Sequence, residues 1–539
     1  MRLHIQNWLR GPYTLLSDDG ATVTKTEPVT QKWLPGDTVD ADGYVVKRQP
    51  IQNLVGIINF VNRTGYGFSP RGAALYMFHP FREDYPPFLV ASKTKYTENH
   101  IAAVNFEHWN DKWPRGGIQR LLGAVGARDV ETAALRASVT IRCDETIVLD
   151  IAHEVGYDCG DWDCVFNIDP TGCLDVDDVF AWRVRGDVTE FAIAIADVAA
   201  WVPEGSALDD LAYERGTTFY DDGAAVVPML PEALSAGAAS LRADGVRRPV
   251  VALVYRLNDD SGAIEHVGFR RCIMTVTRAY TYESIMEDKD TSFTLIAFLT
   301  DVLGRAIDRT DSHAWVELAM VEYNRRAACV LREARVGVMR VHDGTTVGEW
   351  SELAATTGCR EVGFFGYAAG AYVDGGIDGG VEHAGLGLDV YTHASSPLRR
   401  YADLYNQRWL VALCCGGIRP MIMRSPVTMN MRAGMAKAFD STTWFLCHLD
   451  TAGITVVDGW ALVDKGDGIW SVYVPAWKRQ VRGVVVTGGA EVKAGTAMVV
   501  RAYTDLKAVS FRNRVVCSIT PSLPPCCPSL ELVMTLSGR

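Results

Sequence analysis

The stretch that decides the fold is VFNIDPTGCLDVDDVFAWR, residues 165–183, in which four aspartates fall within ten positions between two strand-like apolar runs. They are Asp169, Asp175, Asp177 and Asp178. Carboxylates this close repel one another unless cations neutralise them, so the cluster either faces water or holds metal. Hard oxygen ligands select Mg²⁺ or Mn²⁺ over zinc. Taken alone, the stretch is interpreted either as a metal site or as a solvated acidic turn.

A calcium-binding loop is a third interpretation, and the spacing argues against it. The EF-hand loop ends in a bidentate glutamate at its twelfth position. Counted from Asp169 or Asp175, the twelfth residue is Phe180 or Gly186, and both flanks have the pattern of strands rather than helices. The sequence therefore favours Mg²⁺ or Mn²⁺ as the ion.

A second group of charged residues lies in HASSPLRRYADLYNQR, residues 393–408. Ser396 is a good helix N-cap and the following proline suits the first helical position, so the sequence predicts a helix that begins here. Arg399 and Arg400 would lie in its first turn, where the helix dipole disfavours cations, which indicates a bound anion. Two guanidinium groups at a helix N-terminus form a phosphate site. An ordinary surface ion pair between Arg399 and Asp403 is the alternative.

The first 150 residues have the pattern of short strands separated by Gly, Pro and Asn, which is typical of small β-barrels. Residues 1–50 are interpreted as a truncated OB barrel and residues 51–148 as a cold-shock-like OB domain. The second range contains RTGYGFSPRGAALYMFHPF, which resembles a cold-shock-type OB-fold. In that family such aromatics, here Tyr66, Phe68 and Phe78, form a platform for stacked bases. A packed barrel core or an aromatic cross-strand ladder is the alternative.

The remainder of the chain changes character twice. From 149 to 450, buried-strand runs such as FAIAIADV alternate with helical patterns such as WVELAMVEYNRRAACVLREA, which indicates a mixed α/β domain. Short strands return over 451–520 and predict a C-terminal OB-type barrel, and 521–539 form a tail. Between 455 and 515 there are nine Lys and Arg against five acids, which suits an RNA-binding module or a solvated basic face. We therefore expect a multidomain fold of OB-type barrels around an α/β domain.

Composition excludes several classes of protein. The 539 residues are 48% hydrophobic and too many for one compact core. A net charge of −12 argues against a protein that coats nucleic acid through bulk basicity, although it allows a local basic channel. We expect no membrane span, no secretion signal and, without a GxxxxGK loop, no nucleotide triphosphate. Thirteen cysteines without a paired pattern suit reduced thiols, which predicts a cytoplasmic or other reducing compartment.

These motifs, in this order, resemble those of the ribonuclease II and ribonuclease R family and the catalytic exosome subunit. The resemblance covers about residues 149 to 450, the so-called RNB domain, and rests on the acidic stretch, IAIADVAAWVPEGSALDDLAYERGTTFYDDGAAVVPMLP, WVELAMVEYN and HASSPLRRYADLYNQR. It implies processive 3′ to 5′ hydrolysis of single-stranded RNA to nucleoside 5′-monophosphates by two metal ions. Mg²⁺, with Mn²⁺ as a substitute, is the implied cofactor, and a larger RNA-degradation complex is an implied partner.

The resemblance also assigns roles to residues. The four aspartates hold metal, and Arg399 is the catalytic arginine of a serine-proline-hydrophobic-arginine motif. Tyr220 clamps the terminal base, Tyr282 belongs to a threonine-tyrosine-glutamate step, and Glu317 lies near the terminal ribose, with Leu318 in place of a second glutamate. Tyr282 and Glu317 have alternatives as core or helix-surface residues. The RNA-binding residues expected are Tyr220, Tyr282, Glu317, Arg400, Tyr66, Phe68 and Phe78.

Two positions depart from the family's pattern. Gln407 stands where the family often has histidine, and Ala438 stands where it tends to have glutamate. The leading hypothesis is an active exoribonuclease, since the aspartates and Arg399 are retained. The alternative is a catalytically weak or inactive RNA-binding scaffold of the same fold, of which the departures would be early signs. A metal-dependent nuclease acting on DNA is a third hypothesis.

Overall fold

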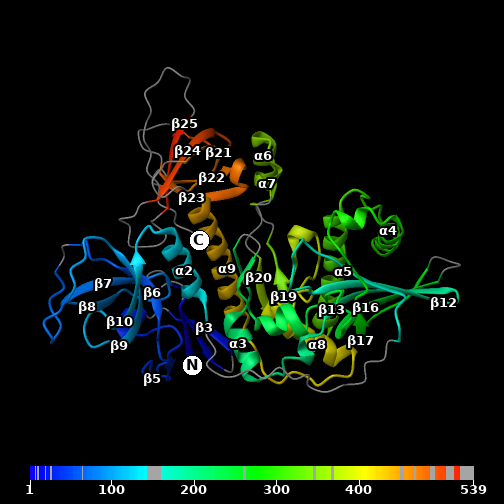
Figure 1. Cartoon of the computed structure of the whole chain (residues 1–539), viewed down its shortest axis with the longest axis horizontal. Helices are drawn as coiled ribbons and strands as arrows, with labels where there is room; N and C mark the ends of the chain where they lie inside the picture. Colours follow the sequence, from blue (N-terminus) through cyan, green and yellow to red (C-terminus); the bar gives the residue numbers. More distant parts are fainter. Residues whose placement is uncertain are drawn as a thin grey trace. The chain divides into compact units, whose positions relative to one another are not determined.

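The computed structural model in Figure 1 describes most of the chain. The described stretches are residues 1–141, 160–448, 455–504 and 515–521. Within them, short gaps fall at 6–7, 9–10, 12, 18–19, 25–26, 63–64, 222–223, 259–262, 344–346, 364, 366–369, 467–468 and 486–491. The predicted tail from 522 onward and the first residues of the predicted catalytic domain, 149–159, lie outside the described residues.

The chain divides into two compact units, each built from separate stretches of sequence. One comprises Met1–Thr140, Trp350–Gly363 and Ala438–Arg539. The other comprises Ile141–Glu349 and Phe364–Lys437. The first unit holds β-sheets from near both ends of the chain, and the second holds the large α/β part that carries both charged motifs.

The N-terminal part of the first unit contains a five-stranded sheet and a closed barrel. The sheet runs β3-β2-β1-β4-β5, from Arg2–Ile5 (β1), Tyr13–Ser17 (β2), Gly20–Thr24 (β3), Thr38–Val39 (β4) and Val45–Lys47 (β5), with the short helix Pro28–Gln31 (α1). The barrel consists of Leu54–Ile58 (β6), Ala74–Pro80 (β7), Phe88–Ser92 (β8), His100–His108 (β9) and Arg115–Ala124 (β10), followed by Arg128–Val139 (α2). A Cβ at Gly116, where β10 pairs with β8, would lie 2.4 Å from Val104 Cγ1, so glycine permits this closure.

The C-terminal part of the first unit is a second five-stranded sheet. Its order is β23-β22-β21-β24-β25, from Thr455–Asp464 (β21), Ile469–Val474 (β22), Arg479–Val485 (β23), Ala497–Thr504 (β24) and Val515–Pro521 (β25). Its core contains Trp470, Val472, Met498 and Val500, which alternate along β22 and β24. The alternation is the period-2 pattern of a sheet with one buried face. The helices Val347–Thr357 (α6), Arg360–Gly363 (α7) and Pro426–His448 (α9) end or lie in this unit.

The second unit is built on a six-stranded sheet in the order β17-β16-β13-β12-β11-β18. The strands are Cys164–Ile168 (β11), Asp178–Arg185 (β12), Val188–Ala196 (β13), Arg247–Asn258 (β16), Ile264–Thr275 (β17) and Arg278–Tyr280 (β18). The run FAIAIA of β13 is buried throughout, as expected of a strand covered on both faces. The sheet is therefore the rigid core to which the first charged motif is attached.

Helices and two small sheets complete the second unit (Figure 1). Helix α8 packs against β17 and against α5. The helices are Ala207–Arg215 (α3), Lys289–Leu303 (α4), Ser312–Glu333 (α5) and Tyr401–Cys414 (α8). The small sheets pair Phe219–Asp221 (β14) with Ala224–Val227 (β15), and Val338–Val341 (β19) with Ala371–Asp374 (β20). The multidomain fold class predicted from sequence, barrels together with an α/β domain, is what the structure has.

The second charged motif differs from its prediction in where its helix begins. Helix α8 starts at Tyr401, not at the residue after Ser396. Arg400 is extended, with φ −134° and ψ 125°, because its backbone pairs with Thr217 on a neighbouring segment. Residues 397–399 form a turn. The helix-dipole argument therefore does not apply to Arg399.

Two findings bear on the class of protein. No helix of the described residues is long and apolar enough to cross a bilayer. Seven of the described cysteines, Cys164, Cys173, Cys329, Cys359, Cys414, Cys415 and Cys447, are free thiols.

Candidate active site

The four aspartates lie where two neighbouring strands meet at one end of the large sheet. Asp169 is the first residue beyond β11, and Asp178 is the first residue of β12. Because β11 and β12 are antiparallel neighbours, the connection that holds Asp175 and Asp177 stays at the same end. The hairpin therefore gathers four carboxylates at one edge of a rigid sheet.

Asp177 is buried, with 4% of its surface exposed, and fixes the turn that carries Arg399. Its Oδ1 accepts a hydrogen bond from the backbone N–H of Leu398 at 2.9 Å, and its Oδ2 accepts one from Arg399 Nε at 3.1 Å. Burial raises the pKa of Asp177 to about 7, although Arg399 and the Leu398 N–H act to lower it. One carboxylate thus joins the two charged motifs, which lie far apart in the sequence.

Asp169 and Asp178 each keep one oxygen, Oδ2, buried and without a hydrogen-bond partner within the described parts of the chain. Burial raises the pKa of Asp169 to about 6, and the charge of Asp175 adds to the rise. Burial and the charges of Asp169 and Asp177 hold the pKa of Asp178 well above its usual range. Native proteins seldom leave buried carboxylate oxygens unpaired, because the desolvation is costly. These two oxygens are the ones that a cation would relieve.

Tyr220, on β14, lies directly on the aspartate loop. Its hydroxyl donates to Asp175 Oδ2 at 2.9 Å, and Cys173 Sγ lies 3.8 Å from the Oδ1 of the same carboxylate. Burial raises the pKa of Tyr220, and the charge of Asp175 raises it further, while Arg399 acts to lower it. The hydroxyl therefore stays protonated and holds the tyrosine in place beside the cluster.

The two arginines of the second motif have different partners. Arg399 Nη2 donates to Ser396 Oγ at 2.9 Å in addition to the contact of Nε with Asp177, and its side chain is 42% exposed. Arg400 donates through Nε and Nη2 to the two oxygens of Asp403, both at 2.8 Å, and Asp403 also accepts from the Ser396 N–H. The predicted Arg399–Asp403 pair is therefore wrong. The charge of Arg400, expected to meet an RNA phosphate, is already paired with Asp403.

Tyr282 and Glu317 have different positions relative to the cluster. Burial raises the pKa of Tyr282, and so do the charges of Asp178 and Asp169, which places this tyrosine near the aspartates. Its ring stacks on His313 with centroids 3.8 Å apart and planes at 10°. Glu317 is exposed on α5 and, within the described chain, makes neither a hydrogen bond nor an ion pair with the cluster.

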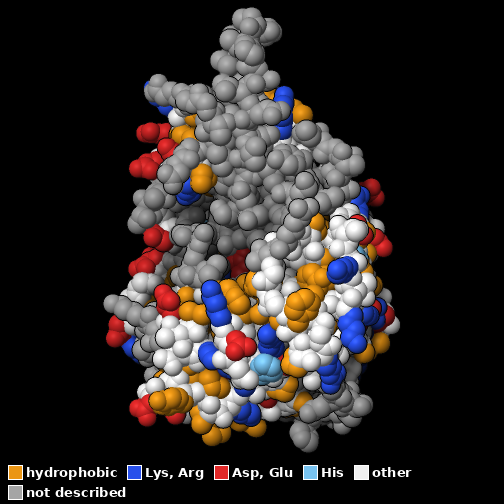
Figure 2. Space-filling view, turned by 90° about the vertical axis from the view of Figure 1, so that its left-hand side faces the viewer, with side chains coloured by type: hydrophobic (Ala, Val, Ile, Leu, Met, Phe, Trp, Pro, Cys, Tyr) orange, Lys and Arg blue, Asp and Glu red, His pale blue; other side chains and the backbone are white. Residues whose placement is uncertain are grey.

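The three barrel aromatics do not share one environment. Phe78 is fully buried and packs edge-on against Phe88, so its prediction as a base-stacking residue is corrected and the packed-core alternative holds for it. Phe68 is 74% exposed and Tyr66 is half-buried. Tyr66 lies in a loop outside the strands. On the face drawn in Figure 2, Lys and Arg are interspersed with apolar and acidic side chains.

Two residues that hold the site together were missed or misread at the sequence level. Asp403 supports the turn from 396 to 400, and its spacing of three from Arg400 is a signal that could have found it. Gln407 is buried, donates to Ala196 O at 2.8 Å and accepts from the Ala199 N–H at 3.1 Å. Gln407 thus anchors α8 to the end of β13, and its departure from the expected histidine lies in a structural position.

The donor set of the hairpin is chemically uniform. All four side chains offer oxygen, which suits a hard divalent cation. In the described portion of the chain, no three His, Cys, Asp or Glu side chains are arranged as a set that could hold a metal ion. The arrangement is therefore a charged carboxylate cluster with two orphaned oxygens.

Comparison with known proteins gives one family match and several relatives. Residues 158–296 and 370–415 match the family described as RNB domain. The human exosome complex exonuclease RRP44 is 23% identical over 461 residues, which are 68% of this chain and 48% of that protein. Exoribonuclease 2 of Klebsiella pneumoniae is 28% identical over 320 residues, 46% of this chain and 49% of that protein. The chain thus spans about half the length of these curated relatives.

Two solved structures share the fold. Mycoplasma genitalium RNase R, solved in complex with ribose-methylated single-stranded RNA, matches with a TM-score of 0.64 at 16% identity, over 94% of this chain and 99% of that chain. Yeast Ssd1, described as a pseudonuclease, matches with a TM-score of 0.62 at 14% identity, over 96% of this chain and 81% of that chain. One fold therefore occurs in proteins described as nucleases and as a pseudonuclease.

Proposed function

We propose that the chain is an RNB-domain protein of the ribonuclease II and ribonuclease R family and a 3′ to 5′ exoribonuclease that hydrolyses single-stranded RNA to nucleoside 5′-monophosphates. One observation carries this proposal. Asp177 binds both the backbone and the side chain of the turn that holds Arg399, so the aspartate hairpin meets a partly exposed guanidinium at this residue. Metal-dependent cleavage of a phosphodiester uses both kinds of group.

Two oxygens of the aspartate hairpin fit a divalent cation, although no three carboxylates of the described residues are already arranged to hold one. The unpaired Oδ2 atoms of Asp169 and Asp178 are buried hard ligands, and these two residues, with Asp175 and Asp177, would hold Mg²⁺ or, as a substitute, Mn²⁺. When bound, two such ions polarise the phosphodiester and activate a water for in-line attack. Burial and the charges of Asp169 and Asp177 raise the pKa of Asp178, and a bound cation would offset both effects.

The chain's own residues supply the remaining functions. Arg399 uses Nε and Nη2 for Asp177 and Ser396, while its Nη1 has no partner among the described residues and is the donor for a phosphoryl oxygen. Such a donor is typically worth about 10²- to 10³-fold in rate. Tyr220 and Tyr282 flank the cluster and would stack the terminal bases without reading sequence. Glu317 would accept the ribose 2′-OH and so reject DNA.

A second candidate function is an RNA-binding scaffold without turnover. The observation in its favour is the similarity in fold to Ssd1, a pseudonuclease. Against it stands the complete set of four aspartates and Arg399 around one hairpin. For either function, assembly into a larger RNA-degradation complex is part of the proposal, because the human relative is named as a component of the exosome complex.

The test uses the full chain and 5′-labelled single-stranded RNA, with the DNA of the same sequence in parallel. We expect shortening from the 3′ end with Mg²⁺ that stops with EDTA and in Asp177→Asn, and no shortening of DNA. The matched control is Asp187→Asn, since Asp187 is an exposed aspartate in the turn after β12. Tight RNA binding without shortening, in both Mg²⁺ and Mn²⁺, would overturn the enzyme and support the scaffold.

A further inference from the structure

Arg340, on β19, is a basic side chain near the catalytic turn whose charge is not paired. Within the described residues its guanidinium makes no hydrogen bond and no ion pair. Its one defined contact is with the ring of Tyr372, whose centroid lies 4.8 Å from the guanidinium carbon. Arg399 and Arg400, by contrast, are paired with Asp177 and Asp403. The two arginines that the sequence singled out therefore have counter-charges, and Arg340 does not.

Charges of both signs lie near Arg340. Burial lowers its pKa and the charge of Arg400 lowers it further, while the phenol of Tyr372 and the charge of Asp403 act to raise it. The nearby His393 is held well below its usual pKa by burial and by Arg400 and Arg340, so it stays neutral. Its Nδ1 lies 2.7 Å from the hydroxyl of Tyr372. An unpaired guanidinium in such a place is costly unless an anion meets it.

Gly370 lies against one side of the guanidinium. A Cβ at position 370 would stand 2.8 Å from both Nε and Nη2 of Arg340, so only a glycine leaves room for the side chain there. The edge formed by the two Nη groups is the other edge through which arginine forms two parallel hydrogen bonds to a phosphate or carboxylate. The Tyr372 ring supports the flat face of the guanidinium. The side chain is only partly buried, so a ligand can reach it.

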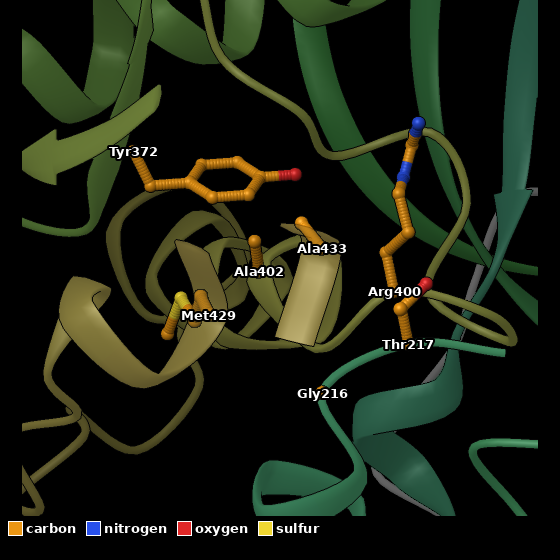
Figure 3. Close-up of a pocket in the computed structure, with 7 residues that line it drawn as sticks. All are labelled: Gly216, Thr217, Tyr372, Arg400, Ala402, Met429 and Ala433. Carbon is orange, nitrogen blue, oxygen red and sulfur yellow. The ribbon is translucent and has the colours of Figure 1, made fainter. Parts of the chain in front are cut away.

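The cavity beside Arg400 does not supply the anion. It lies between Tyr372 and Arg400, with Thr217 and Ala433 among its other lining residues, and Figure 3 shows the Tyr372 hydroxyl pointing across it toward the Arg400 side chain. Its volume of about 30 Å³ holds water rather than a phosphate. An anion at Arg340 therefore approaches from the exposed side of the guanidinium.

We propose that Arg340 is a phosphate-binding residue that contacts one phosphodiester of a single-stranded RNA strand. A carboxylate ligand fits the geometry less well, because the strand whose end is bound at the aspartate hairpin carries phosphates and no carboxylates. The inference rests on the proposed function only for the source of the phosphate. The contact with an RNA phosphate that the sequence predicts for Arg400 is thereby assigned to Arg340.

The test measures binding without turnover. Affinity for a labelled single-stranded RNA is determined in EDTA over a series of NaCl concentrations, for the wild type, Arg340→Met and Arg305→Met. Arg305 is an exposed arginine after α4 and serves as the matched control for loss of one positive charge. We expect roughly tenfold weaker binding by Arg340→Met at moderate salt. The slope of log K against log salt should become shallower by about 0.7, the value for one phosphate contact in a single strand.

Further variants keep the test decisive. If Arg340→Met fails to fold, Arg340→Lys and Arg340→Gln replace it: the lysine should retain the salt slope of the wild type and the glutamine should lose it. An unchanged slope in Arg340→Met, or equal slopes for the lysine and glutamine variants, would overturn the inference. Wild-type protein that binds RNA in EDTA with the expected slope difference but never shortens RNA with Mg²⁺ would refute the proposed function and leave Arg340 as a phosphate contact.

Discussion

Two buried aspartate sites in the second unit differ in whether their oxygens have partners. Asp209, on α3, is fully buried. Its Oδ1 accepts from Tyr401 Oη at 2.7 Å and pairs with Arg408 at 2.8 Å, and its Oδ2 accepts from Arg424 at 2.7 Å and the Gly205 N–H at 2.9 Å. Burial acts to raise its pKa, but Arg408, the Gly205 N–H and Arg424 lower it below the usual range.

The aspartate hairpin shows the opposite pattern. Asp169 and Asp178 are each left with an unpaired buried oxygen, and burial raises the pKa of both. Stability alone favours the satisfied arrangement at Asp209, since an unpaired buried charge costs free energy. The difference teaches that carboxylate burial by itself does not mark a functional site. The unsatisfied carboxylates are the ones that need a ligand or a reaction to explain them.

The largest expected effect is on activity, at the aspartate hairpin, where two carboxylate oxygens have no hydrogen-bond partner among the described residues. In the proposed exoribonuclease, Asp178→Asn should reduce activity on the order of 10³-fold, because it removes a proposed metal ligand. Its free energy of unfolding, measured by urea titration in EDTA, should be unchanged or higher, since burial and the neighbouring aspartates already disfavour the charged carboxylate that the amide replaces. Asp187→Asn is the control. A clear loss of stability in Asp178→Asn would contradict the distinction drawn between the two sites.

Substitution of Asp209, whose oxygens are all paired, should lower the free energy of unfolding rather than the catalytic rate. Asp209→Ala leaves Arg408 and Arg424 buried without their carboxylate, and it should lower the free energy of unfolding by about 3 to 5 kcal/mol. Asp210→Ala is the matched control: Asp210 also contacts Arg424, but its side chain is 61% exposed, so the loss should stay below about 1 kcal/mol. Equal losses of unfolding free energy for the two variants would show that burial of an ion pair does not determine how much the pair stabilises the fold.

A third substitution is at Asp403. Its oxygens are paired with Arg400 and with the Ser396 N–H, and these contacts support the turn that lies against the aspartate hairpin. Asp403→Asn loses the paired contact with Arg400 and loosens the turn that presents Arg399. We expect kcat to fall roughly 10- to 100-fold and the melting temperature to fall as well, because Arg400 loses its buried counter-charge, while RNA affinity in EDTA changes little. Rescue is expected in neither Mn²⁺ nor excess Mg²⁺. An effect on affinity alone would instead assign Asp403 to RNA binding.

The smallest effect concerns pH. The pKa of Asp209 is lower in the folded chain than the ordinary aspartate pKa of about 3.8. Its ion pairs therefore stabilise the folded chain fully at pH values above 3.8. This stabilisation is lost as the pH falls through the pKa that Asp209 has in the folded chain. The difference in unfolding free energy between the wild type and Asp209→Asn should therefore be largest near neutral pH and shrink below about pH 4. A difference that grows on acidification would reverse the sign assigned to this group.

Much of the architecture could be predicted from local pattern. Buried runs such as that of β13 and the long amphipathic helix α5 follow from periodicity, and the acidic hairpin follows from two strands that flank four aspartates. The start of α8 could not be predicted, because pairing of Arg400 with Thr217 overrides a good capping sequence at Ser396. Phe78 was misassigned for a similar reason: alternation places a residue on a face, and only barrel closure decides which face is inside.

The sequence by itself determined which groups are proposed to carry the chemistry: the four aspartates are neighbours in the chain, and covalent connection keeps them close. Tertiary structure alone decided how they are used. It brought Leu398 and Arg399 into contact with Asp177, paired Arg400 with Asp403, and formed no ion pair to Arg340 among the residues that the structure describes. Pairing of charges depends on distances of a few ångströms between segments far apart in the chain, and those distances exist only after the sheet and helices have packed.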